Sequence, residues 1–178
     1  MEMREKKIEG TTIFDGKVVR LDKDKVLCPN GKESYREIIR HPGGAGILCI
    51  TKEDNVLLIK QFRYAYDEVI YEIPAGKLEH NEDPYLAALR EFEEETGNKA
   101  EELISLGHIY PTCGYSAEKI YLYLALNVSP CERHLDEDEV IEIEYVPLNK
   151  VKEMILNGEI KDAKTICAIT QYLLKYNK

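Results

Sequence analysis

The chain has 178 residues, 44% of them hydrophobic, which is enough to bury one good core without disulfides or a structural metal. Its net charge of −9, from 24 basic and 33 acidic side chains, argues against a general nucleic-acid-binding surface. No apolar run approaches the roughly 20 residues that cross a bilayer, and the first ten residues lack the apolar centre of a signal peptide. We therefore expect a cytoplasmic protein with no membrane or nucleic-acid partner.

Cysteine usage argues against a disulfide framework and against zinc. The five cysteines are odd in number, scattered, and contain no C-x-x-C pair: Cys28, Cys49, Cys113, Cys131 and Cys167. The four histidines are equally scattered. We expect reduced thiols and no metal site built from Cys or His.

The first 40 residues are expected to form a small β-segment. Residues 11–14 and 18–27 read as two strands around a turn at Asp15-Gly16, and Pro29-Asn30-Gly31 indicates a further turn. These strands have no core of their own and need another surface, such as that of a second subunit. Residues 41–178 are expected to form the main domain.

The rest of the chain shows many strands and few helices. Strands are expected at residues 35–40, 45–50, 56–63 and 71–73 before an acidic helix, and at 104–110, 120–127 and 140–146 after it. Two helices, 148–157 and 163–176, close the chain. The glycine-rich residues 43–46 lack a G-K-[ST] ending and a following helix, so they indicate a strand entry and not a phosphate loop. This order predicts an α+β sandwich.

The sequence predicts where the acidic helix begins and ends. Asp83 suits the N-cap, Pro84 the first turn, and Gly97 the C-terminal cap. At about 100° per residue, acidic and apolar side chains should lie on opposite faces. The acidic face holds Glu91, Glu94 and Glu95, and the core face holds Tyr85, Leu86, Leu89, Phe92 and the methyl of Thr96.

Three carboxylates on one helical turn indicate a cation-binding site. Two bare carboxylates about 4 Å apart repel by roughly 4 kcal/mol at an effective dielectric constant near 20. Hard oxygen ligands favour Mg²⁺ or Mn²⁺, which take substrate phosphate oxygens as further ligands. The alternative is a solvated acidic face, in which Arg90 and Glu94 form an ordinary i, i+4 pair. The spacing of the whole segment favours the metal.

That spacing resembles the Nudix box, G-x5-E-x7-R-E-U-x-E-E-x-G-U, where U is apolar. The matching residues are Gly76, Glu82, Arg90, Glu91, Phe92, Glu94, Glu95 and Gly97, and Asn98 departs from the final apolar position. The resemblance implies a Nudix-type α/β/α sandwich with a mixed sheet and an N-terminal β-appendage. It also implies that Glu91, Glu94 and Glu95 hold the metals with the carbonyl of Ala75, while Arg90 and Glu82 orient them. Glu79 and Glu93 have no role in this pattern.

Segments outside the box are similar to the ADP-ribose pyrophosphatase branch of the family, namely REI, QFRYAYDE and YEIPAGKLE. The resemblance implies a homodimer that exchanges the N-terminal β-segment and stacks adenine between its subunits. It places Arg63 and Arg36 on the diphosphate, where guanidinium groups suit phosphate oxygens. Glu72 resembles a carboxylate that contacts substrate, and it could equally be a paired strand residue.

The loop at residues 112–118 is similar to a mobile loop of the same branch. By that resemblance, Glu118 activates or orients the attacking water, a role that hydrolysis at phosphorus requires. Cys113 stands where the branch usually carries a proline that marks its substrate. The identity of the substrate is therefore less firmly implied than the reaction.

Together these patterns predict hydrolysis of a nucleoside diphosphate linked to another moiety, with ADP-ribose giving AMP and ribose 5-phosphate as the first expectation. One alternative keeps the chemistry and changes the substrate to another nucleotide sugar or an oxidised nucleoside phosphate. Another is a module that senses a nucleotide without cleaving it. The intact box and the absence of a fused DNA-binding domain argue against the sensing module.

Overall fold

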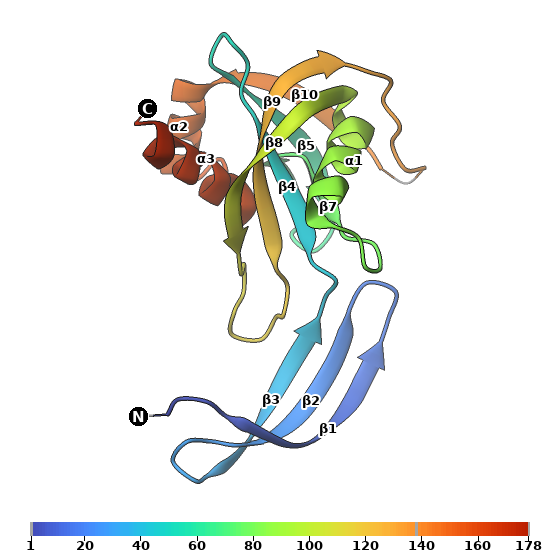
Figure 1. The fold of residues 1–178 in the computed structure, drawn as a ribbon, viewed down its shortest axis with the longest axis vertical. Coiled ribbons are helices and arrows are strands. Elements are labelled where there is room, and N and C mark those ends of the chain that lie inside the picture. Colours follow the sequence, from blue (N-terminus) through green and yellow to red (C-terminus); the bar gives the residue numbers. More distant parts are fainter. Residues whose placement is uncertain (1, 138, 178) are drawn as a thin grey trace. The chain divides into compact units, whose positions relative to one another are not determined.

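The computed structural model describes residues 2–137 and 139–177, which form two compact units (Figure 1). The first unit runs to Gly43 and includes Tyr110–Lys119. The second comprises Gly44–Ile109 and the chain from Ile120 onward. In the described part of the chain, no helix has the length and apolar character needed to span a membrane.

The first unit is a three-stranded antiparallel sheet in the order β1-β2-β3. Its strands are β1 (Lys6–Asp15), β2 (Arg20–Leu27) and β3 (Glu33–Arg40), so both predicted turns are confirmed and β1 begins earlier than expected. Every residue of β1 is exposed. On central β2 the buried residues are Asp22, Asp24 and Val26. Ion pairs to Lys7 and Arg40 therefore replace apolar packing over much of one face.

The second unit contains two sheets. A mixed sheet has the order β7-β4-β9-β8, with β4 and β9 parallel, and an antiparallel sheet has the order β10-β5-β6. The strands are β4 (Gly44–Cys49), β5 (Asn55–Arg63), β6 (Glu68–Glu72), β7 (Ala75–Lys77), β8 (Asn98–Ile109), β9 (Ile120–Pro130) and β10 (Ile141–Pro147). Strand β7 was not predicted. The glycine-rich segment enters β4, as expected.

Three helices cover the strands of the second unit on two sides (Figure 1). Helices α2 (Leu148–Leu156) and α3 (Ala163–Tyr176) pack on one apolar core, which includes Leu58, Val151 and Ile169. Helix α1 (Pro84–Thr96) packs on a second core, which includes Ile47 and Phe92. The predicted α+β class with an α/β/α arrangement and a mixed sheet is confirmed.

Candidate active site

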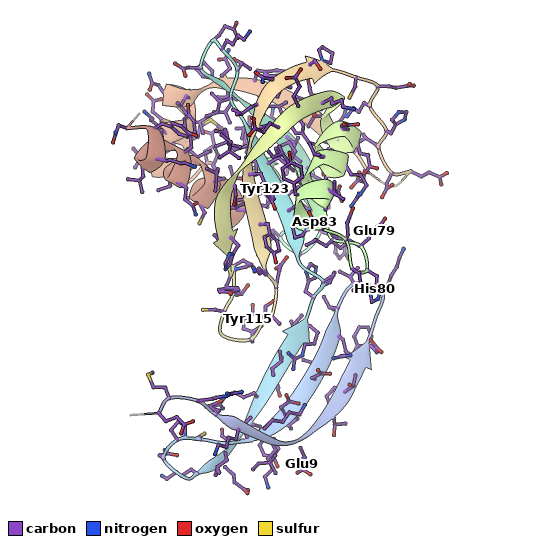
Figure 2. The ribbon with its side chains drawn as sticks, viewed as in Figure 1. Glu9, Glu79, His80, Asp83, Tyr115 and Tyr123 are labelled. Carbon is purple, nitrogen blue, oxygen red and sulfur yellow. The ribbon has the colours of Figure 1, made fainter. Side chains whose placement is uncertain are left out.

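Helix α1 begins and ends where the sequence predicts. The side chain of Asp83 accepts hydrogen bonds from the backbone N–H groups of Tyr85 (2.9 Å) and Leu86 (3.4 Å). Gly97 adopts a left-handed conformation with φ of 63° at the C-cap. Figure 2 shows Asp83 at the start of the helix and Glu79 and His80 in the loop before it. These caps fix the rotation of the acidic residues about the helix axis.

The buried face of α1 differs from the expected one. Leu86 is exposed, whereas Ala87, Ala88 and Phe92 are fully buried. Glu95, expected on the solvent side, has only 3% of its surface exposed. The expectation that carboxylates and core point apart is therefore wrong for Glu95. The reason is that β4, β7 and β8 all pack against α1, so the buried arc is wider than one apolar stripe.

The buried carboxyl of Glu95 is held by the backbone of β7. One of its oxygens accepts a hydrogen bond of 2.9 Å from the N–H of Ala75. Burial is the main reason that the pKa of Glu95 is raised to about 8; the Ala75 hydrogen bond lowers this pKa, and the negative charges of Glu91 and Glu139 raise it. Burial also raises the pKa of Glu91, although Arg90 opposes this. Both carboxyls would be stabilised in their charged forms by a cation.

Gly76 lets β7 approach Glu91 closely. A Cβ atom built at residue 76 would lie 1.8 to 2.1 Å from the carboxyl atoms of Glu91, so a side chain there fits only if this carboxyl moves. The glycine that opens the sequence pattern therefore makes room for a carboxylate against backbone. Two carboxyls of raised pKa beside the partly buried backbone of Ala75 and Gly76 fit a hard divalent cation.

Arg90 connects the acidic residues around the helix. Its Nε and Nη2 donate to the two carboxylate oxygens of Glu82 at 3.0 and 3.1 Å. Its Nη1 lies 2.9 Å from Glu91 Oε1 and 2.9 Å from Glu94 Oε2. The hydrogen bonds from Arg90 hold the pKa of Glu82 below its usual value. Arg90 thus contacts Glu82, Glu91 and Glu94, and its role in orienting metal ligands stays a prediction.

The three predicted ligands do not converge as they stand. Across residues 2–137 and 139–177, no three His, Cys, Asp or Glu side chains form a cluster that could hold a metal ion. Glu94 is turned toward Arg90, and Glu95 toward Ala75. The donor types suit the cation, and the glycine at residue 76 leaves space for the carboxyl of Glu91. Glu94 would have to turn from Arg90 to join Glu91 and Glu95.

Glu72, which is buried, pairs with the partly exposed Arg63. Arg63 donates to both oxygens of Glu72, from Nε at 2.6 Å and from Nη2 at 2.8 Å. Glu72 also pairs with Lys164. Burial alone would raise the pKa of Glu72, but Arg63 and Lys164 outweigh it and hold this pKa below its usual value. The geometry favours the paired-strand interpretation of Glu72, while Arg63 keeps 38% of its side chain exposed.

Two predicted residues belong to the first unit. Arg36 donates from Nε to Glu5 Oε2 at 3.0 Å, so it takes part in an ion pair there. Glu118 Oε1 lies 3.6 Å from His41 Nδ1, and the loop that carries it is hydrogen-bonded to Ile39 of β3. The roles of Arg36 and Glu118 stay predictions.

Sequence reasoning missed Glu139. Its charge raises the pKa of both Glu91 and Glu95, which places it near the acidic site. Its signal in the sequence is an acidic run at residues 136–139, which has no periodicity that would relate it to α1.

Comparisons with known proteins define the class. Residues 40–169 match the family model of the NUDIX domain, so the chain belongs to the Nudix hydrolases, as its box implied. It is 44% identical over 173 residues to the ADP-ribose pyrophosphatase of Bacillus subtilis (strain 168), covering 96% of this chain and 93% of that protein. It is 43% identical over 171 residues to the methanol dehydrogenase activator of Bacillus methanolicus, covering 95% and 92%. The fold matches a crystal structure of an ADP compounds hydrolase with a TM-score of 0.84, at 19% identity over 97% of this chain and 96% of that one.

Proposed function

We propose that this chain hydrolyses the pyrophosphate of ADP-ribose to give AMP and ribose 5-phosphate. The reaction class is supported by one arrangement above all: Glu91 and the buried Glu95 lie against the backbone of Ala75 and Gly76. The substrate is supported by the near-full-length identity to a protein named an ADP-ribose pyrophosphatase.

The proposed cofactor is Mg²⁺ or Mn²⁺, held by the carboxylates of Glu91, Glu94 and Glu95 and by the carbonyl of Ala75. When bound, the cation would neutralise negative charge on the phosphate oxygens. Arg90 and Glu82 would keep the carboxylates in place through the hydrogen bonds described above.

The proposed diphosphate contacts are Arg63 and Arg36, and Glu72 is proposed to contact the substrate and lies beside Arg63. Arg63 carries the better structural support. Both of its hydrogen bonds within the described residues go to Glu72 and use Nε and Nη2, so Nη1 is left to donate to a phosphate oxygen. Glu72 fixes the plane of this guanidinium group.

Glu118 is proposed to orient the attacking water, and Glu139 is a second candidate because its charge acts on Glu91 and Glu95. Glu118→Gln is expected to lower kcat by about 10²- to 10⁴-fold. Glu139→Gln is the paired measurement. If Glu139→Gln lowers kcat to that extent while Glu118→Gln keeps the wild-type rate, Glu139 and not Glu118 orients the attacking water.

The proposed assembly is a cytoplasmic homodimer formed through the N-terminal β-segment. Support comes from β1, which is exposed along its whole length and includes the large apolar side chains Ile8, Ile13 and Phe14. Such a surface is unusual on a monomer. Sedimentation of the pure protein as a monomer at micromolar concentration would rule the dimer out.

The function is tested by a panel of nucleotide substrates with Mg²⁺ in heavy-oxygen water. We expect ADP-ribose to give AMP and ribose 5-phosphate, and the isotope in one product identifies the phosphorus attacked. Faster cleavage of another nucleotide sugar or of an oxidised nucleoside phosphate would change the substrate and keep the chemistry. Tight binding of ADP-ribose without products would identify a sensing module.

A further inference from the structure

The first turn of α3 supports the chain segment that leads into the active site. Thr165, which is fully buried, accepts a hydrogen bond of 2.8 Å at Oγ1 from the backbone N–H of Ile73. The same hydroxyl donates to Asp162 Oδ2 at 2.5 Å, and Asp162 also accepts from the backbone N–H of Thr165 as the N-cap of α3. The helix cap and the strand segment are therefore one hydrogen-bonded unit.

Lys164, the neighbour of Thr165, is a buried cation with no part in the proposed reaction. Only 9% of its side chain is exposed, and buried lysines are rare unless they are paired. Its ammonium group pairs with Glu72 Oε2 and lies 3.1 Å from Asp162 Oδ1. With Arg63 on the other side of Glu72, two cations and two carboxylates form a cluster without net charge.

Each residue from 72 to 75 has at least one polar group that is held by a hydrogen bond or an ion pair. Glu72 is held by Arg63 and Lys164, and the N–H of Ile73 by Thr165. The carbonyl of Pro74 accepts a bond of 2.9 Å from Ile47 of β4, and the N–H of Ala75 donates to Glu95. Residues 72–75 are thus bonded to the first turn of α3 at one end and to helix α1 at the other.

We propose that Lys164 and Thr165 are positioning residues of the hydrolytic site, an inference that rests on the proposed function. Lys164 balances the charge of Glu72, so the guanidinium of Arg63 remains attractive to a diphosphate. Thr165 holds the backbone N–H of Ile73 in place. Ala75 follows two residues further along the chain, so Thr165 also limits the movement of the Ala75 carbonyl, which is a proposed metal ligand. Neither side chain touches the substrate or the cation in this proposal.

Lys164 is tested by the division of its effect between KM and kcat. In Lys164→Met the cluster acquires a net negative charge around Arg63, so we expect KM for ADP-ribose to rise about tenfold while kcat stays within about threefold. Lys164→Arg restores the charge and should restore KM. Ile169→Val is the matched control, because it removes one methylene from a buried residue that lies five positions further along α3. The proposal fails if Ile169→Val raises KM as much as Lys164→Met, or if folded Lys164→Met keeps the wild-type KM.

Thr165 is tested by metal binding without turnover. We expect Thr165→Val to weaken the binding of Mn²⁺ about tenfold, measured from the electron paramagnetic resonance signal of free Mn²⁺, and Thr165→Ser to bind as the wild type does. Equal Mn²⁺ affinity in the wild type and in folded Thr165→Val would overturn the role of Thr165. If the wild type released no AMP from ADP-ribose, the proposed function would fail, while this binding measurement would still decide whether Thr165 supports the metal site.

Discussion

Replacing Glu95 by glutamine is expected to lower kcat for ADP-ribose at least about 100-fold without destabilising the metal-free protein. The change removes a proposed anionic ligand, and glutamine keeps the shape and an oxygen that can accept from the N–H of Ala75. Stability should be retained because Glu95 is 3% exposed and a buried charge without a cation is unfavourable. The measurements are kcat with Mg²⁺ and the melting temperature in a chelator.

The matched control for this variant is Glu93→Gln on the same helix. Glu93 is partly exposed, and its ion-pair contact is a 3.7 Å approach to Lys99, so the change should leave both kcat and melting temperature unaltered. A Glu95→Gln enzyme with the wild-type kcat would remove Glu95 from the metal ligands.

The raised pKa of Glu95 gives the same variant a second readout. In the folded metal-free protein this pKa is about 8, against an ordinary value of 4.5, so between these pH values the folded state binds a proton that the unfolded chain has lost. The free energy of unfolding should therefore fall as the pH rises through this window, and the stabilising contribution is complete only below it. Glu95→Gln should lack this part of the pH dependence. Equal slopes for the two proteins in chelator would show that Glu95 titrates normally.

The helices were predictable because their signals are local. Asp83, Pro84 and Gly97 lie at the ends of α1 and determine them without reference to the rest of the chain. Strands were less predictable where pairing is distant. Strand β7 has three residues and exists because it pairs with β4. The first half of β8 is rich in charged residues and has no clear alternation, and it is a strand because it pairs with the end of β9.

The active site also has features that local sequence predicts and features that it does not. The contact of Arg90 with Glu82 follows from a pattern within one short segment. The burial of Glu95 does not, because three strands from different parts of the chain form the surface that covers α1. The pair of Glu72 with Lys164 joins residues 92 positions apart, and no periodicity within either segment indicates it. Resemblance to a family supplied Glu72 as a candidate, and only the structure supplies its partner.

Adding one methyl group at residue 76 is expected to remove most of the activity and little of the stability. In Gly76→Ala the new Cβ would lie within 2.1 Å of the carboxyl of Glu91, so this carboxyl has to move. The end of a flexible side chain can do so at little cost to the fold, and we expect the free energy of unfolding to change by less than about 1 kcal/mol. A metal ligand displaced by an ångström or more should lower kcat about 100-fold. Both quantities are measured on the same preparation, with Mg²⁺ titrated to separate weak metal binding from slow turnover.

For Gly46→Ala, in the same sheet, we expect the opposite result, with stability lost and the Mg²⁺ dependence of the activity kept. The new Cβ would meet Ile73 Cδ1 at 3.1 Å and Leu122 Cδ2 at 3.4 Å, which are core atoms and not carboxyl oxygens. Overpacking of a core typically costs 1 to 3 kcal/mol, so this variant should lose roughly that much stability while its Mg²⁺ dependence stays normal. If Gly76→Ala instead lost stability and kept its activity, the close approach of β7 to Glu91 would serve the packing of α1, and the room at Gly76 would no longer support a metal site there.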